Sequence, residues 1–200
     1  MHTTLDIVAL DAQAVRASVE LVARARPADM ARPTPCADWT LHGLIAHMAT
    51  QHYGFAAAAA GDGDLGSWRA RRLGGDPVAA YRASADAVLG AFCADGILER
   101  ELTLPEFTPV TAFPARQAIS FHFIDYVVHS WDVAKALGAD AEFGEDLPRA
   151  ALRVARAVPE GEARLAPGAA FAPVVDCPGG SLLDQVVAIL GRSPDWERPG

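Results

Sequence analysis

Apolar residues recur every three or four positions over most of this chain, which is the spacing of helices that bury one face. The first such segment runs from about residue 4 to residue 25, and Pro27 ends it because proline cannot continue a helix. The second follows Thr40, or Asp38 just before it, since either side chain can cap a helix N-terminus. It extends to about Ala60, so the pattern predicts two long helices before residue 61.

Two more long helices are expected in the middle of the chain. Asp76 followed by Pro77 is typical of a helix start, with a capping side chain and then proline at the first helical position. Apolar residues at helical intervals continue this third helix until near Gly96. The fourth helix is predicted from about Pro114 to Gly138, where glycine suits the residue after a helix end.

Two shorter helices are expected near the C-terminus, over about residues 146–158 and 181–190. The second begins with Ser181 and Asp184, which have the spacing of a capping box. Residues 98–104 and 171–175 are candidates for short strands in the connections. The sequence therefore predicts a mainly all-α fold, an antiparallel four-helix bundle with two shorter C-terminal helices, forming a single domain over residues 1–200.

The fourth predicted helix carries a carboxylate and an imidazole inside an otherwise apolar stretch. Asp125 and His129 are four residues apart, so on a helix they lie one above the other on the same face. Polar groups on an apolar face need a partner, and the usual partners are a metal ion or a buried hydrogen-bond network. On spacing alone, a metal site and a buried pair with an arginine or with His129 itself remain alternatives for Asp125.

His47 lies at the edge of the apolar face of the second predicted helix. With Asp125 and His129 it would complete a set of two histidines and one carboxylate, which leaves coordination positions open for a substrate. A single histidine in such a place is more often an ordinary core or surface residue than a ligand.

Three further histidines compete for a place in this set. His122 lies three residues before Asp125 and could pair with it instead of His129. It cannot easily share an ion with His129, because seven helical residues span about 10 Å along the axis. His52 is rotated by about 140° from His47 on the second helix, and His42 faces away from Leu41 and Ile45, so both are predicted to lie on the surface.

Composition narrows the classes of function. The net charge of −8 provides no basic surface for nucleic acid or an anionic membrane. The three cysteines, Cys36, Cys93 and Cys177, are too few for a disulfide framework, and none lies in a motif that lowers a thiol pKa. With no signal-peptide pattern and no apolar segment of transmembrane length, we expect a cytoplasmic protein with no membrane association.

Two motifs resemble a known family. Residues 32–47, RPTPCADWTLHGLIAH, and residues 125–134, DYVVHSWDVA, are similar to the two signatures of actinobacterial metal-binding proteins related to the N-terminal domain of mycothiol-dependent maleylpyruvate isomerase. Residues 182–196 resemble the C-terminal end of the single-domain members of that group. The resemblance covers nearly the whole chain and implies a DinB-like four-helix bundle without the second domain of the isomerase.

The resemblance also implies a site. It assigns His47, Asp125 and His129 as the metal ligands, with Asp125 standing where the isomerase has a glutamate. The ion would be divalent, with zinc favoured and nickel or iron as alternatives. A low-molecular-weight thiol such as mycothiol would be the cosubstrate, and the reaction would be thiol transfer to a small molecule or its thiol-assisted isomerisation. The alternative is a non-catalytic bundle that binds metal or a small ligand, and either form would be a monomer or a homodimer.

Overall fold

The structure, a computed structural model, describes residues 6–36, 39–108, 112–166 and 169–199. Within these ranges two short antiparallel strands, β1 and β2, pair Leu102 with Phe113. The remaining elements are mainly helices, as the sequence predicts. The bounds are α1 Ile7–Val22, α2 Leu41–Ala59, α3 Pro77–Phe92, β1 Glu101–Thr103, β2 Ala112–Pro114, α4 Ala115–Leu137, α5 Asp146–Ala155 and α6 Leu182–Ile189.

The predicted helix starts are present with their capping bonds. The Thr40 hydroxyl accepts a hydrogen bond from the backbone N–H of Gly43 at 3.2 Å, whereas Asp38, the alternative cap, lies outside the described residues. Ser181 and Asp184 form the reciprocal bonds of a capping box at the start of α6. The first helix is shorter than predicted, because the side chain of Asp6 caps it and fixes its start at residue 7.

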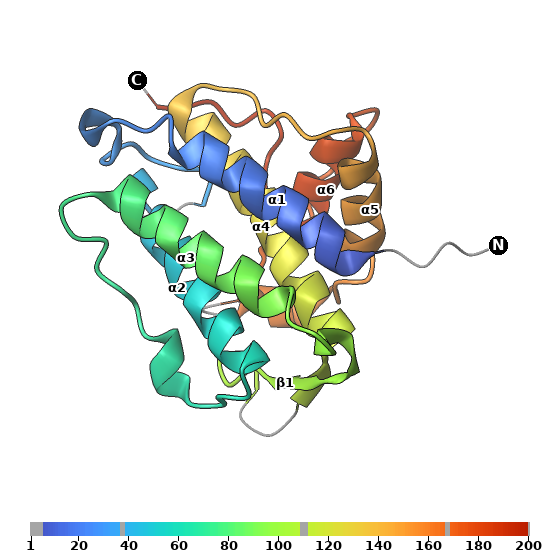
Figure 1. Ribbon diagram of the computed structural model, residues 1–200. Coiled ribbons are helices and arrows are strands. Elements are labelled where there is room, and N and C mark those ends of the chain that lie inside the picture. The colour runs from blue at the N-terminus through green and yellow to red at the C-terminus, as the bar shows by residue number, and fades with distance from the viewer. Residues whose placement is uncertain (1–5, 37–38, 109–111, 167–168, 200) are drawn as a thin grey trace.

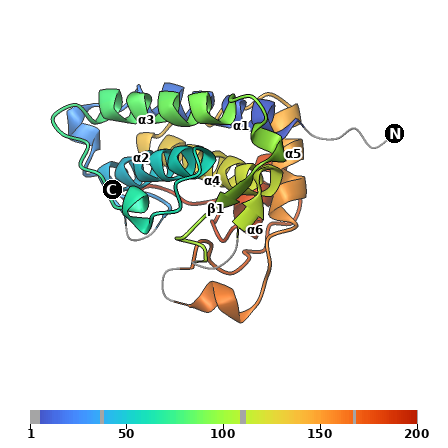
Figure 2. The ribbon, with the colours of Figure 1, turned by 60° about the horizontal axis from the view of Figure 1, so that its bottom comes forward.

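The four long helices form the predicted bundle, in which α1 is antiparallel to α3 and α2 is antiparallel to α4. Figure 1 shows that α1 and α4 run in one direction and α2 and α3 in the other. In Figure 2, α1 and α3 form one layer, and α2 and α4 form the second. The connection over residues 60–76 returns the chain to the starting end of α2, so that α3 runs parallel to α2 and not against it. As a result α2 and α4 lie side by side and antiparallel.

The C-terminal helices form a smaller layer outside the bundle. Helix α5 packs on α6, and both contact α4. The strand considered for residues 171–175 is not formed, and this prediction was wrong. The backbone N–H of Val175 instead donates to the carbonyl of Ala188 in α6 at 2.9 Å, so the segment is held by a helix end and not by a second strand. Across the described ranges no helix combines the length and apolarity that crossing a membrane requires.

The prediction that His52 lies on the surface was also wrong, whereas His42 is exposed as expected. The side chain of His52 is fully buried and stacks on Tyr126, with 4.3 Å between ring centroids. Its Nδ1 atom lies 2.9 Å from the hydroxyl of Ser84 in α3. His52 is turned away from His47, as predicted. However, α3 covers that face of α2, so the His52 side chain does not reach solvent.

Candidate metal centre

The structure brings His47, Asp125 and His129 together between two antiparallel helices. His47 comes from α2, and the other two come from consecutive turns of α4. One potential ligand atom of each residue lies within 4.8 Å of those of the other two. His129 Nε2 lies 3.3 Å from Asp125 Oδ1, and the rings of His47 and His129 meet edge to face with centroids 5.3 Å apart.

The three side chains of the cluster differ in exposure to solvent. The side chain of His129 is only 5% exposed, whereas that of Asp125 is 24% exposed, and His47 is half-buried. Trp39, just before α2, covers His47 with 4.3 Å between the two ring centroids.

The protonation states of these three residues differ in the metal-free protein. Burial and the nearby His129 lower the pKa of His47 to about 4, so its imidazole is neutral at pH 7 and keeps a lone pair for binding. Burial disfavours charge on His129, but the attraction of Asp125 and Asp132 outweighs it and raises the pKa to about 9. Burial likewise opposes ionisation of Asp125, but His129 outweighs this and holds the carboxyl pKa at about 2. At neutral pH His129 and Asp125 are thus an ion pair.

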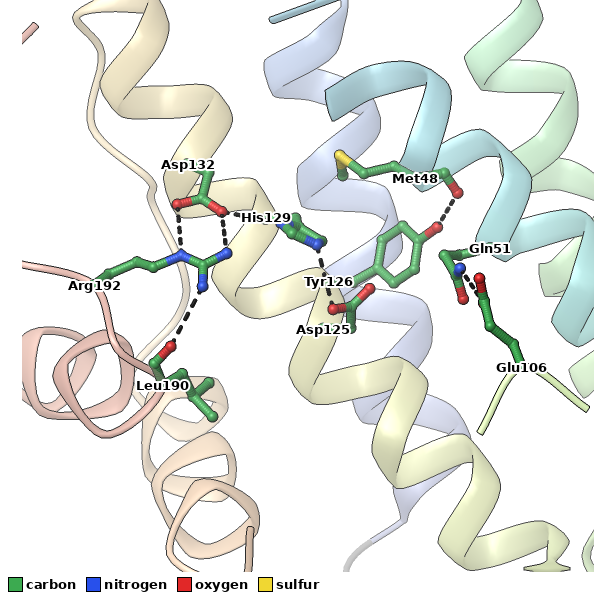
Figure 3. Close-up of polar contacts among 9 residues, drawn as sticks. All are labelled: Met48, Gln51, Glu106, Asp125, Tyr126, His129, Asp132, Leu190 and Arg192. Atoms are coloured by element: carbon green, nitrogen blue, oxygen red, sulfur yellow. Dashed lines mark hydrogen bonds and ion pairs between the residues drawn. The ribbon is translucent and has the colours of Figure 1, made fainter. Parts of the chain in front are cut away.

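A second carboxylate fixes the orientation of the His129 ring. His129 Nδ1 donates to Asp132 Oδ2 at 2.9 Å, and this carboxylate also accepts two bonds from Arg192, 3.0 Å from Nη2 and 3.3 Å from Nε (Figure 3). Because Nδ1 is engaged, Nε2 is the nitrogen that faces Asp125. Neither residue was predicted from the sequence to take part in the site. The spacing of Asp132 three residues after His129 could have indicated it, but nothing local connects Arg192 to this helix.

His122, the competing ligand, is part of a different network. Its Nδ1 atom lies 2.7 Å from Asp11 Oδ1 on α1, and both side chains are almost completely buried. The ring packs against Phe55 and Phe92, with centroids 4.8 and 5.2 Å away. The structure therefore places His122 in the interior of the bundle and leaves Asp125 beside His129.

A contact between α2 and another carboxylate was also missed from sequence. Gln51, one turn after His47 on α2, is buried and donates through Nε2 to Glu106 Oε2 at 2.6 Å. Figure 3 also draws Tyr126, whose hydroxyl donates to the carbonyl of Met48 in α2. Glu106 is in the connection between β1 and β2, far from α2 in sequence, so helical periodicity could not reveal the contact.

The donor set fits a divalent ion. Neutral imidazole nitrogens and a carboxylate oxygen suit zinc, iron and nickel, and three protein donors leave room for an outside ligand. Donors bound at about 2.1 Å in tetrahedral geometry lie about 3.4 Å apart, so closing this cluster around an ion requires side-chain shifts of about an ångström. The hydrogen bond from His129 to Asp132 supplies the outer carboxylate that commonly orients a metal-binding histidine.

Comparison with known proteins points to one group. The family model of the mycothiol maleylpyruvate isomerase N-terminal domain matches residues 12–134. Uncharacterized proteins from two strains of Mycobacterium tuberculosis are 30% identical over 181 residues, covering 86% of this chain and 90% of each relative.

The fold has relatives among solved structures. The crystal structure of a mycothiol-dependent maleylpyruvate isomerase is similar with a TM-score of 0.65 and 17% identity, covering 95% of this chain and 90% of that one. A histidine-to-alanine mutant of such an isomerase gives a TM-score of 0.60 and 14% identity, covering 96% of this chain and 81% of that one. These similarities confirm the DinB-like helical fold.

Proposed function

The chain belongs to the family of the mycothiol maleylpyruvate isomerase N-terminal domain, and we propose that it binds one divalent metal ion and uses it to activate a low-molecular-weight thiol. The ligands would be His47, Asp125 and His129. The observation that carries this proposal is their convergence from two helices, with potential ligand atoms within 4.8 Å of one another. The thiol named by the solved relatives is mycothiol, so mycothiol or a similar thiol is the proposed cosubstrate.

An ion in this position would lower the pKa of a coordinated thiol and polarise a carbonyl group. The protein residues set the conditions for that chemistry. His47 is already neutral, and the single carboxylate of Asp125 would leave a divalent site with net positive charge, which favours an anionic sulfur. The exposed side of Asp125 is where thiol and substrate would enter. The proposed reaction is thiol transfer to a small molecule or its thiol-assisted isomerisation.

The alternative is a structural ion that only joins α2 to α4. A structural site usually has four protein ligands, whereas this cluster offers three and has an exposed edge. The catalytic proposal is therefore better supported. Both proposals place the same ion on the same residues, and they differ in whether an outside ligand reaches it.

The proposal is tested with protein purified without a metal-binding tag. Elemental analysis is expected to find about one divalent ion per chain, and zinc is the ion we expect. Mycothiol and maleylpyruvate, the pair named by the solved relatives, are the first substrates to assay, followed by other thiols and small electrophiles. Bound metal with no thiol-dependent turnover and no thiol binding would favour the structural alternative, and absence of metal would contradict both.

Metal affinity is expected to increase with pH between about 6 and 8. In the metal-free protein the His129 pKa is about 9, so His129 must lose a proton before Nε2 can bind an ion. The apparent association constant should therefore rise ~10-fold per pH unit and level off above the His129 pKa. Calorimetric titration in buffers of different ionisation enthalpy should show release of about one proton per ion. A pH-independent affinity would contradict the proposed role of His129.

Replacing Cys36 with alanine is expected to leave metal content and thiol-dependent activity unchanged. The Cys36 thiol is half-buried. Burial opposes the charge of Arg192, but its pKa is raised because its attraction to Asp132, with a smaller contribution from Cys36, outweighs the effect of burial. The proposal nevertheless takes the reactive sulfur from an external thiol. Elemental analysis and an activity assay of Cys36→Ala, with Cys93→Ala as the control, check this. Lost activity with metal still bound would make Cys36 the nucleophile.

A further inference from the structure

The chain after α6 returns to the helix that carries two of the proposed ligands. Gly191, with a φ of 83°, allows the turn that leads from α6 to this segment. The side chain of Lys135 in α4 donates to the carbonyl of Pro194 at 3.1 Å, and Arg198 donates to the carbonyl of Ala136 at 3.3 Å. The segment is therefore fastened to the last turn of α4, the helix that carries His129.

Arg192 is the residue through which this segment reaches the cluster. Its side chain is only 6% exposed, and Asp132, its partner, is completely buried. The guanidinium also donates to the carbonyl of Leu190 at 3.3 Å, so one end is anchored to the end of α6 while the other holds both oxygens of Asp132 (Figure 3). Two-point contact of this kind fixes the plane of the carboxylate as well as its position.

The arrangement is hard to explain by stability alone. A buried ion pair contributes little net stability, because removing both charges from water offsets most of their attraction. What the pair does supply is a defined acceptor for His129 Nδ1, 2.9 Å from Asp132 Oδ2. Without that acceptor the ring could turn, and either nitrogen could carry the proton.

We propose that Arg192 is a positioning residue for the metal centre. It holds Asp132, Asp132 holds the His129 ring, and Nε2 is thereby directed toward Asp125 and His47. The segment after α6 is then a functional part of a site whose ligands all lie in the four-helix bundle. This inference rests on the proposed function, because it requires that His129 binds an ion.

The chain provides a matched control in Arg164. This side chain is also buried, at 7% exposure, and it also anchors the end of α6 by donating to the carbonyl of Ile189. It also donates to the backbone carbonyls of Val158, Pro159 and Ala172, so it holds the same C-terminal layer through acceptors other than Asp132. A role confined to packing predicts similar effects from both arginines.

The test compares Arg192→Lys with Arg164→Lys in the full chain. Thermal melts report the structural cost, competition with a chromophoric chelator reports zinc affinity, and the absorption spectrum of the Co²⁺-loaded protein reports ligand geometry. We expect Arg192→Lys to lower zinc affinity by about 10- to 100-fold and to change the cobalt spectrum. Arg164→Lys is expected to lower the melting temperature while keeping wild-type affinity and spectrum.

A second variant keeps the test decisive if Arg192→Lys does not fold. Asp132→Asn keeps the size of the side chain and is expected to give the same loss of affinity, and combining the two substitutions should add little. Wild-type affinity and spectrum in a folded Arg192→Lys or Asp132→Asn protein would overturn the inference while leaving the metal site in place. A wild-type protein that binds no zinc would overturn the proposed function itself, and the inference with it.

Discussion

Replacing His129 with alanine is expected to abolish stoichiometric metal binding and the stability that depends on it. An ion that binds only the folded chain adds its binding free energy to folding. At a free metal concentration about a thousand times the dissociation constant this contribution is about 4 kcal/mol. His129 is the best choice for the experiment because it contacts Asp125 through one nitrogen and Asp132 through the other.

The measurement is a set of calorimetric melts of wild type and His129→Ala, each with added zinc and with excess chelator. Wild type should melt at a lower temperature in chelator, and the variant should melt at the same temperature in both conditions. His42→Ala is the matched control, since this imidazole is exposed on the same helix as His47 and should change neither metal content nor the response to chelator. A wild-type melting temperature that chelator does not change would show that the ion does not support the fold.

Replacing His122 with leucine is expected to destabilise the protein strongly without changing its metal content. Asp11 is 1% exposed and lies 2.7 Å from His122 Nδ1, so the substitution leaves a buried carboxyl group without this partner. Leaving a buried polar group without its hydrogen-bond partner costs about 1–3 kcal/mol, and more when the group is charged. The expected result is a lower denaturation midpoint together with full metal stoichiometry, measured by urea unfolding and elemental analysis.

Asp11→Leu combined with His122→Leu distinguishes the lost partner from other effects of the substitution. When both polar groups are replaced by apolar ones, the desolvation cost disappears, so the double variant should recover part of the lost stability. If the double variant is no more stable than His122→Leu alone, the cost comes from packing against Phe55 and Phe92 and not from Asp11. Loss of metal from His122→Leu comparable to that from His129→Ala would instead contradict the ligand assignment.

Local chemistry in the sequence was sufficient to predict the helices. The caps at Thr40, Asp76 and Ser181 act within a few residues, and the structure contains each of them. Two of the three proposed ligands could also be paired from the sequence. Asp125 and His129 are four residues apart, so they share one face of a helix. That His47 would meet them required the resemblance to a family, since spacing within one helix cannot show which helix packs against it.

The missed features are contacts between distant parts of the chain. Arg192 lies 60 residues from Asp132, and Glu106 lies 55 residues from Gln51, so neither contact has a local signal. His52 was misplaced for a related reason. Helical rotation shows which residues share a face, but only the packing of α3 decides that the second face of α2 is buried as well.

We propose that His47, Asp125 and His129 hold one ion with a position open to a thiol. Titration of the metal-free protein with Co²⁺, followed by N-acetylcysteine, tests both halves in one absorption experiment. We expect saturation at about one Co²⁺ per chain and then a new sulfur-to-cobalt charge-transfer band when the thiol is added. Failure to bind cobalt, or an unchanged titration in the His47→Ala, Asp125→Ala and His129→Ala variants, would contradict it.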